Sequence, residues 1–91
     1  MALEIDREVE NTGLILNYHK VEFVLFEKAQ DFVEIKIGMY PNKEASQSGK
    51  SPVSEYYAQV PYAQFNGSGT LLDIAYNVLK THESFEGAID V

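Results

Sequence analysis

Few residues in this chain have the chemistry that catalysis or metal binding requires. His19 and His82 are the only histidines, and neither has a His, Asp or Glu at a spacing that would fix a metal ion. We interpret both as packing or surface residues. The chain has no cysteine, and no other nucleophile stands in a motif beside a base. The sequence therefore predicts no catalytic residue, no metal site and no cofactor.

Two short motifs resemble functional sites without completing them. Gly49-Lys50-Ser51 has the form of the end of a phosphate-binding loop. That motif requires a glycine where the chain has Glu44, and a helix where it has Pro52. We therefore reject a nucleotide site. Asn66-Gly67-Ser68 matches a glycosylation acceptor, but without a secretion signal we interpret it as a turn.

Tyrosines are the residues most suited to a binding role. Tyr40, Tyr56, Tyr57 and Tyr62 flank a long connector. Tyrosine combines an apolar body with a polar tip and is enriched at protein interfaces. Ordinary packing on a sheet edge explains the same pattern, and the sequence leaves both interpretations open.

The strands that must position these residues follow from alternating polarity. Within the first ten residues, Leu3, Ile5 and Val9 lie on one face with Arg7, and acidic residues lie on the other. The acidic set is Glu4, Asp6, Glu8 and Glu10. We interpret it as protection of a strand edge rather than as a cation site.

The centre of the chain predicts two further strands. Residues 14–26 become apolar on both faces toward Phe26, which indicates a central strand covered on both sides at that end. Residues 32–40 alternate cleanly, and their core face consists of Val33, Ile35, Ile37 and Met39. Gly38 marks a bulge or the close approach of another backbone.

The second half predicts a connector, a strand, a helix and a tail. Asn42 caps a short helical turn that ends at Gly49, and residues 53–62 form a strand. Thr70 begins a helix of about three turns with Asp73 completing a capping box. Its apolar stripe consists of Leu71, Leu72, Ala75, Val78 and Leu79. The apolar tail, Phe85 to Val91, lies back on the body or on a neighbouring molecule.

Composition limits the classes of function. The chain has 91 residues, which we expect to form a single domain, 1–91, and a formal net charge of −7. An acidic surface disfavours nucleic acid and anionic membranes as partners. The N-terminus lacks the basic start of a signal peptide, and no apolar run is long enough to span a bilayer. We expect a soluble protein made in the cytoplasm.

Several motifs, read together, resemble a family of small virion-associated proteins of tailed bacteriophages and prophages. They are Tyr18-His19-Lys20-Val21, the connector from Tyr40 to Pro52, a tyrosine-rich strand, the helix segment Ala75 to Lys80, and the tail from Phe85 to Val91. The chain departs from the family pattern at Ser46, where arginine is common, and at residues 66–69, where a longer insertion is common. The resemblance implies a structural component of the tail or baseplate region and no catalytic residues.

These observations give one expectation for fold and two for function. The fold is α+β, a small antiparallel β-sheet of four to five strands with one C-terminal α-helix packed on it. The favoured function is assembly in a virion, as a homo-oligomer bound to other virion proteins and made in the host cytoplasm. The alternative is a small acidic cytoplasmic inhibitor or DNA mimic that binds a host enzyme. The expected interface residues are Tyr40, Tyr56, Tyr57, Tyr62, Phe85 and Ile89.

Overall fold

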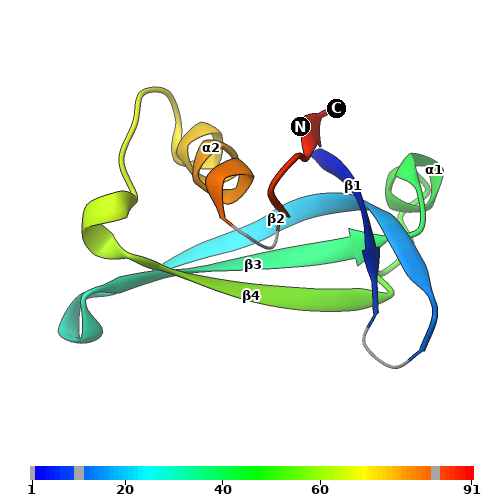
Figure 1. Cartoon of the computed structure of the whole chain (residues 1–91), viewed down its shortest axis with the longest axis horizontal. Helices are drawn as coiled ribbons and strands as arrows, with labels where there is room; N and C mark the ends of the chain where they lie inside the picture. Colours follow the sequence, from blue (N-terminus) through cyan, green and yellow to red (C-terminus); the bar gives the residue numbers. More distant parts are fainter. Residues whose placement is uncertain (1, 10–11, 83–84) are drawn as a thin grey trace.

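A five-stranded antiparallel sheet with one main helix forms the body of the chain (Figure 1). The computed structural model describes residues 2–9, 12–82 and 85–91. The strands are β1 (Leu3–Glu8), β2 (Ile15–Glu27), β3 (Phe32–Tyr40), β4 (Ser54–Pro61) and β5 (Ile89–Asp90), in the order β4-β3-β2-β1-β5. The helices are α1 (Lys43–Gln47) and α2 (Leu71–Thr81), with short 3-10 turns η1 (Lys28–Gln30) and η2 (Tyr62–Gln64). The expected α+β fold is confirmed.

Strand β1 has the predicted alternation. Leu3 is buried, and Glu4, Asp6 and Glu8 are exposed; Glu10 lies outside the described residues. The pairing of β1 with β2 shifts register between Glu4 and Arg7. On its other side β1 pairs with β5 at Leu3 and Glu4 only, so the acidic residues beyond Glu4 still line a sheet edge.

Strand β2 differs from the prediction at a β-bulge. Its pairing with β3 shifts register between Val21 and Phe23, which leaves Glu22 as the extra residue. Because one extra residue exchanges the two faces, Val24 packs against the core while Phe23 lies on the opposite side. The expectation that β2 is covered on both faces near Phe26 is therefore wrong.

A buried hydrogen bond from the helix accompanies this bulge. The backbone N–H of Val21 donates to the hydroxyl of Tyr76 in α2, at 2.9 Å. The bulge interrupts the ladder at this point, and Tyr76 supplies the acceptor that a buried N–H needs. The helix thus stabilises the change of face in β2.

Strands β3 and β4 follow the predicted pattern. Val33, Ile35, Ile37 and Met39 are all buried. In β4 the inward side chains are Tyr56, Ala58 and Val60. The strand ends at Pro61, so Tyr62 lies in η2 rather than on the strand face where it was expected.

Both predicted helix caps are present. The Asn42 side chain accepts a hydrogen bond from the Ala45 N–H, and Thr70 and Asp73 form a reciprocal capping box. The buried residues of α2 are Ala75, Tyr76 and Leu79. Leu71 and Leu72 were expected in the buried stripe, but they are exposed because contact of α2 with the core begins one turn later.

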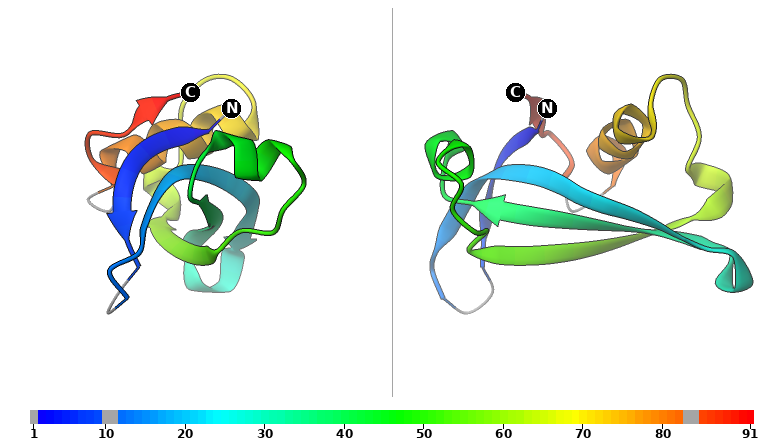
Figure 2. Two further views of the ribbon diagram at one scale, coloured as in Figure 1. Left: turned by 90° about the vertical axis from the view of Figure 1, so that its right-hand side faces the viewer. Right: turned by 180° about the vertical axis from the view of Figure 1, so that it is seen from behind.

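The C-terminal segment lies back on its own chain. Phe85 is completely buried, and the backbones of Ala2 and Val91 exchange two hydrogen bonds beside β5. Helix α2, Phe85 and the curled-over β1 therefore close one face of β3 and β4 (Figure 2). Within the described residues, none of the helices is long and apolar enough to cross a membrane.

Candidate protein interface

The face of β2, β3 and β4 opposite α2 has no helix over it in the views of Figure 1 and Figure 2. We call this surface the open face. The pairing register arranges its side chains in rows across the three strands. One row is Phe23, Lys36, Tyr57; the next is Leu25, Glu34, Gln59; the last is Glu27, Phe32, Pro61.

The apolar part of the open face is only half covered. Phe23 and Leu25 are each 44% exposed, and Tyr57 is 50% exposed. Phe23 and Leu25 are two residues apart on one strand, and Tyr57 lies in the same row as Phe23. Three large side chains therefore gather on one exposed sheet face, as at protein-binding surfaces.

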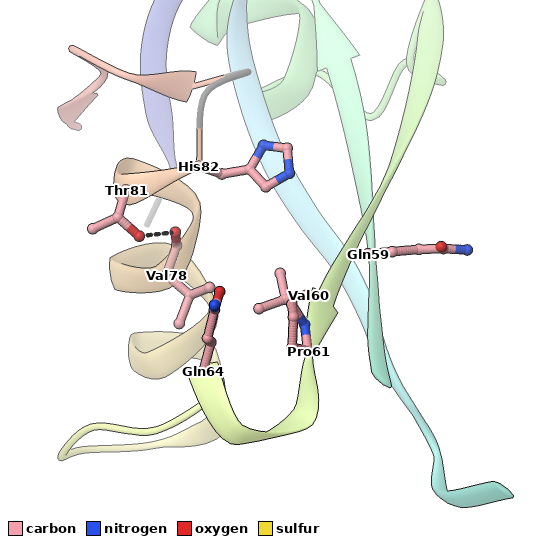
Figure 3. A pocket seen from close by; sticks show the side chains of 7 residues that line it. All are labelled: Gln59, Val60, Pro61, Gln64, Val78, Thr81 and His82. Atoms are coloured by element: carbon pink, nitrogen blue, oxygen red, sulfur yellow. Dashed lines mark hydrogen bonds between the residues drawn. The ribbon is translucent and has the colours of Figure 1, made fainter. Parts of the chain in front are cut away.

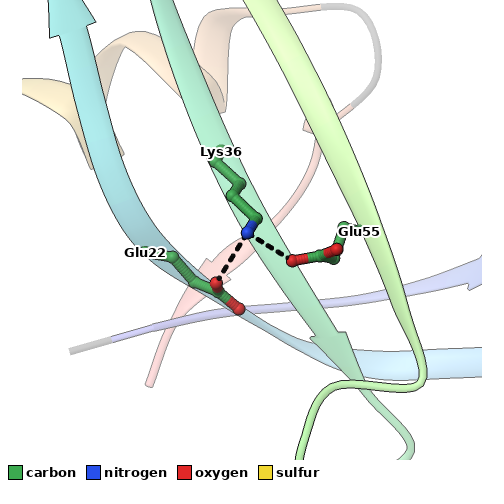
Figure 4. Close-up of polar contacts among 3 residues, drawn as sticks. All are labelled: Glu22, Lys36 and Glu55. Carbon is green, nitrogen blue, oxygen red and sulfur yellow. Dashed lines mark ion pairs between the residues drawn. The ribbon is translucent and has the colours of Figure 1, made fainter.

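An ion-pair network lies at the middle of this surface (Figure 4). The Lys36 Nζ lies 2.6 Å from a carboxylate oxygen of Glu55 and 3.5 Å from one of Glu22. It also lies 5.5 Å from the ring centroid of Phe23. The hydrogen bond from Lys36 to Glu55 raises the pKa of the Lys36 ammonium above its ordinary value. This lysine is thereby held in place between two carboxylates.

Gly38 provides the space that this network needs. A Cβ atom at this position would collide with the Glu22 carboxylate and would lie 3.3 Å from the Pro52 Cβ. Gly38 was expected to mark a bulge or the close approach of another backbone, but the atoms that approach it belong to side chains, and the bulge lies in β2 opposite Ile37 and Lys36. The extra residue of that bulge, Glu22, is the one that crosses Gly38 to reach Lys36.

The open face carries more negative than positive charge. Its carboxylates are Glu22, Glu27, Glu34 and Glu55, and its cations are Lys20 and Lys36. Glu22, Glu55 and Lys36 together keep one negative charge, and Glu27 and Glu34 add two more against the single charge of Lys20. A partner that carries basic groups beside apolar side chains is therefore favoured here.

Three of the residues expected at the interface pack inside the chain. Tyr40 is buried with its ring centroid 6.3 Å from that of Tyr18. Tyr56 is partly buried beneath the Arg7 guanidinium, which lies 4.4 Å from the centre of its ring. Phe85 has no exposed surface. We therefore leave Tyr40, Tyr56 and Phe85 out of the candidate interface.

The other three expected residues are exposed but lie in different places. Tyr57 belongs to the open face, Tyr62 packs in η2 with its ring centroid 6.2 Å from that of Phe26, and Ile89 lies on β5. The structure does not bring them into one patch. Sequence reasoning missed Phe23 and Leu25, although the apolar character of both faces of β2 was the signal that could have identified them.

His19 belongs to the interior. It is 1% exposed, and its Nε2–H donates to the Ile5 carbonyl at 2.7 Å. Burial lowers the pKa of the imidazole below 6.5, against the effect of the Ile5 hydrogen bond, and the positive charge of Arg7 lowers it further. The prediction that His19 is a packing or surface residue is confirmed as packing.

A shallow pocket of about 330 Å³ lies between the end of α2 and the end of β4 (Figure 3). Its lining residues are Gln59, Val60, Pro61, Gln64, Val78, Thr81 and His82. The Thr81 hydroxyl is used locally, since it donates to the Val78 carbonyl at 2.8 Å. The Gln59 side chain points away from the pocket toward the open face. Among the residues that the structure describes, no group of His, Cys, Asp or Glu could hold a metal ion.

Comparison with known proteins found no match, so a functional assignment depends on the geometry of the site. No protein-family model matches the chain, and no curated protein or solved structure is significantly similar to it. The resemblance to phage virion proteins stays a prediction. Of the surfaces described above, the open face has the largest exposed apolar side chains gathered on regular structure.

Proposed function

We propose that this protein is a structural component of a tailed-phage particle that acts by binding another virion protein through its open face, without catalysis of its own. The observation that carries the proposal is the half-exposed group Phe23, Leu25 and Tyr57 on a sheet face without a helix. Soluble proteins rarely leave large apolar side chains together on a surface unless another molecule covers them.

The energetics of this face suit protein binding. Fully burying an aromatic or leucine side chain contributes about 1.5–3 kcal/mol relative to full exposure, and about half of each side chain here is still available. The side chains stand on strands that are paired on the sheet, so little ordering is needed when a partner binds. The favoured partner surface combines apolar side chains with basic groups that face the carboxylates.

The particle context comes from the sequence. The motifs from Tyr18 to Val21 and from Ala75 to Lys80 resemble those of small tail-region and baseplate-region proteins. A chain of 91 residues with net charge −7 fits a subunit that is made in quantity in the host cytoplasm and stays soluble until it assembles. Symmetric repetition is the usual way in which such small subunits build extended contacts.

A second candidate function rests on β1. The exposed carboxylates Glu4, Asp6 and Glu8 form an acidic row along a strand that is paired with β5 at only one end. Such a row favours an acidic inhibitor or DNA mimic that occupies the basic site of a host enzyme.

Quantitative mass spectrometry of purified particles separates the two candidates. The proposal predicts this chain in the particles at a fixed ratio to a tail or capsid protein. Its presence only in the lysate of infected cells would overturn the virion assignment, and capture of a host nuclease or polymerase by the purified chain would favour the inhibitor.

A further inference from the structure

Strand β4 ends the sheet on the side away from β1. It pairs with β3 along its whole length, and no other strand of the described residues pairs with it. In the right half of Figure 1 it forms the lower border of the sheet. An unpaired edge presents backbone N–H and C=O groups that can pair with another strand.

The register identifies which groups these are. The Tyr62 N–H donates to the Asp31 carbonyl at 3.1 Å, directly beyond the pair Pro61 and Phe32. Backbone groups alternate in direction along an antiparallel strand, so the even-numbered residues of β4 face β3. Glu55, Tyr57 and Gln59 therefore direct their N–H and C=O groups outward.

The outward run is bounded at both ends. Pro61 has no N–H to donate, and the Val53 N–H is already used, since it donates to the Met39 carbonyl at 2.9 Å. The segment available for pairing is therefore short and centred on Tyr57. Of its three outward residues, Tyr57 and Gln59 are uncharged and Glu55 carries a carboxylate.

We propose that two copies of this protein pair through β4, antiparallel and related by a two-fold axis at Tyr57. In this register Glu55 of each copy lies opposite Gln59 of the other, so each carboxylate meets an amide and not a second carboxylate. The two Tyr57 side chains lie opposite each other at the axis, and every outward N–H and C=O of the segment finds a partner.

Neighbouring registers are less favourable. An axis at Glu55 sets the two Glu55 carboxylates against each other, and like charges directly opposite are destabilising. An axis at Gln59 brings Pro61 into the pairing opposite Tyr57, where a donor is lost. An axis at Tyr56 sets Gln59 opposite Val53, whose N–H is already used, and an axis at Ala58 sets Glu55 opposite Pro61, which has none. Only the axis at Tyr57 pairs the three outward residues with one another.

Pairing through β4 joins the two open faces into one surface. Tyr57, at the border of each open face, becomes the centre of the joined surface, with Phe23 and Leu25 of each copy on either side. This inference rests on the proposed function, because the joined surface is the one to which another virion protein would bind. Its test uses the purified chain alone, so that either idea can fail without the other.

The first experiment is sedimentation velocity of the purified chain from micromolar to millimolar concentration, for the wild type, Gln59→Pro and Gln59→Ala. Proline at this position removes an outward N–H and leaves the hydrogen bonds to β3 in place. We expect concentration-dependent dimers for the wild type and Gln59→Ala, and monomers for Gln59→Pro. A monomeric wild type at millimolar concentration, or dimers of Gln59→Pro as strong as those of the wild type, would overturn the inference.

A charge series keeps the test decisive if proline disturbs folding. Gln59→Lys places an ammonium opposite Glu55 of the other copy, and Gln59→Glu places a second carboxylate there. Because the dimer contains two such cross-strand pairs, each substitution should change its dissociation constant by about 2-fold to about 30-fold. The dissociation constant should decrease for Gln59→Lys and increase for Gln59→Glu. Equal dissociation constants, or loss of the dimer in Leu25→Ser instead, would overturn β4 as the pairing edge.

Discussion

The two faces of β2, β3 and β4 are built from alternate residues of the same strands, yet they have opposite fates. On the covered face Val33, Ile35 and Ile37 are buried beneath α2, β1 and the C-terminal segment. On the open face Phe23, Leu25 and Tyr57 stay half exposed around an ion-pair network. The difference teaches that the same strands serve both stability and recognition, and that each of these roles belongs to one face of the sheet.

The bulge at Glu22 makes this separation possible. Without it, Phe23 and Leu25 would continue the inward alternation of His19 and Val21 and would point into the core. With it, both side chains are displayed outward, beside the ion pair of Glu22 with Lys36. One extra residue therefore supplies the apolar side chains that β2 contributes to the open face.

The comparison predicts its largest contrast between two phenylalanines. Phe85→Ala should lower the free energy of unfolding by about 3–5 kcal/mol, because the ring is fully buried against His19 and Tyr56. Phe23→Ala should lower it by about 1 kcal/mol or less, since that ring is already half in water. Urea denaturation followed by circular dichroism measures both. Equal losses would contradict the division of the sheet into two faces.

Two tyrosines provide the next contrast. Tyr76→Phe removes the acceptor of the buried Val21 N–H, which should cost about 1–3 kcal/mol of unfolding free energy. Hydrogen exchange should show faster exchange of the Val21 amide in this variant. Tyr57→Phe, which alters an exposed hydroxyl, is the matched control and should change neither measurement. An unchanged Val21 amide would show that Tyr76 does not stabilise the bulge.

The covered face contains a buried histidine, His19, that should make the free energy of unfolding depend on pH. His19 has a pKa below 6.5 in the folded chain, mainly because it is buried. As the pH falls through about 6.5, the unfolded chain takes up a proton that the folded chain does not, so stability decreases until the lower pKa is passed. Denaturation at a series of pH values should show this slope in the wild type and in His82→Gln. The slope should shrink in His19→Gln, and an unchanged slope would contradict the burial of a neutral His19.

Local rules predicted those parts of the fold that depend on neighbours in the sequence. The alternation of Val33 to Met39 and the capping box of Thr70 and Asp73 needed only residues a few positions apart. The bulge could not be predicted in this way, because the Tyr76 hydroxyl that accompanies it is 55 residues from Val21. The candidate interface depends on the bulge, so the exposure of Phe23 and Leu25 was not predictable either.

The position of the C-terminal tail could not be predicted from the sequence either. Its apolar residues predicted contact with either the body or a neighbour, and only the three-dimensional position of His19 and Tyr56 places Phe85 in the core. Tyrosine content alone likewise identified Tyr57 and Tyr40 together, although the first is exposed and the second is buried. Composition indicates which residues suit an interface, and the fold decides which of them reach it.

The central claim is that the open face recognises a partner while the covered face holds the fold. The most direct test compares incorporation of two double variants into particles, Phe23→Ser with Leu25→Ser, and Leu71→Ser with Leu72→Ser. The second pair removes apolar side chains of similar or greater exposure from α2 and serves as the matched control. We predict that both variants fold, that the open-face variant is lost from purified particles, and that the α2 variant is incorporated normally. Normal incorporation of a folded open-face variant would contradict the account.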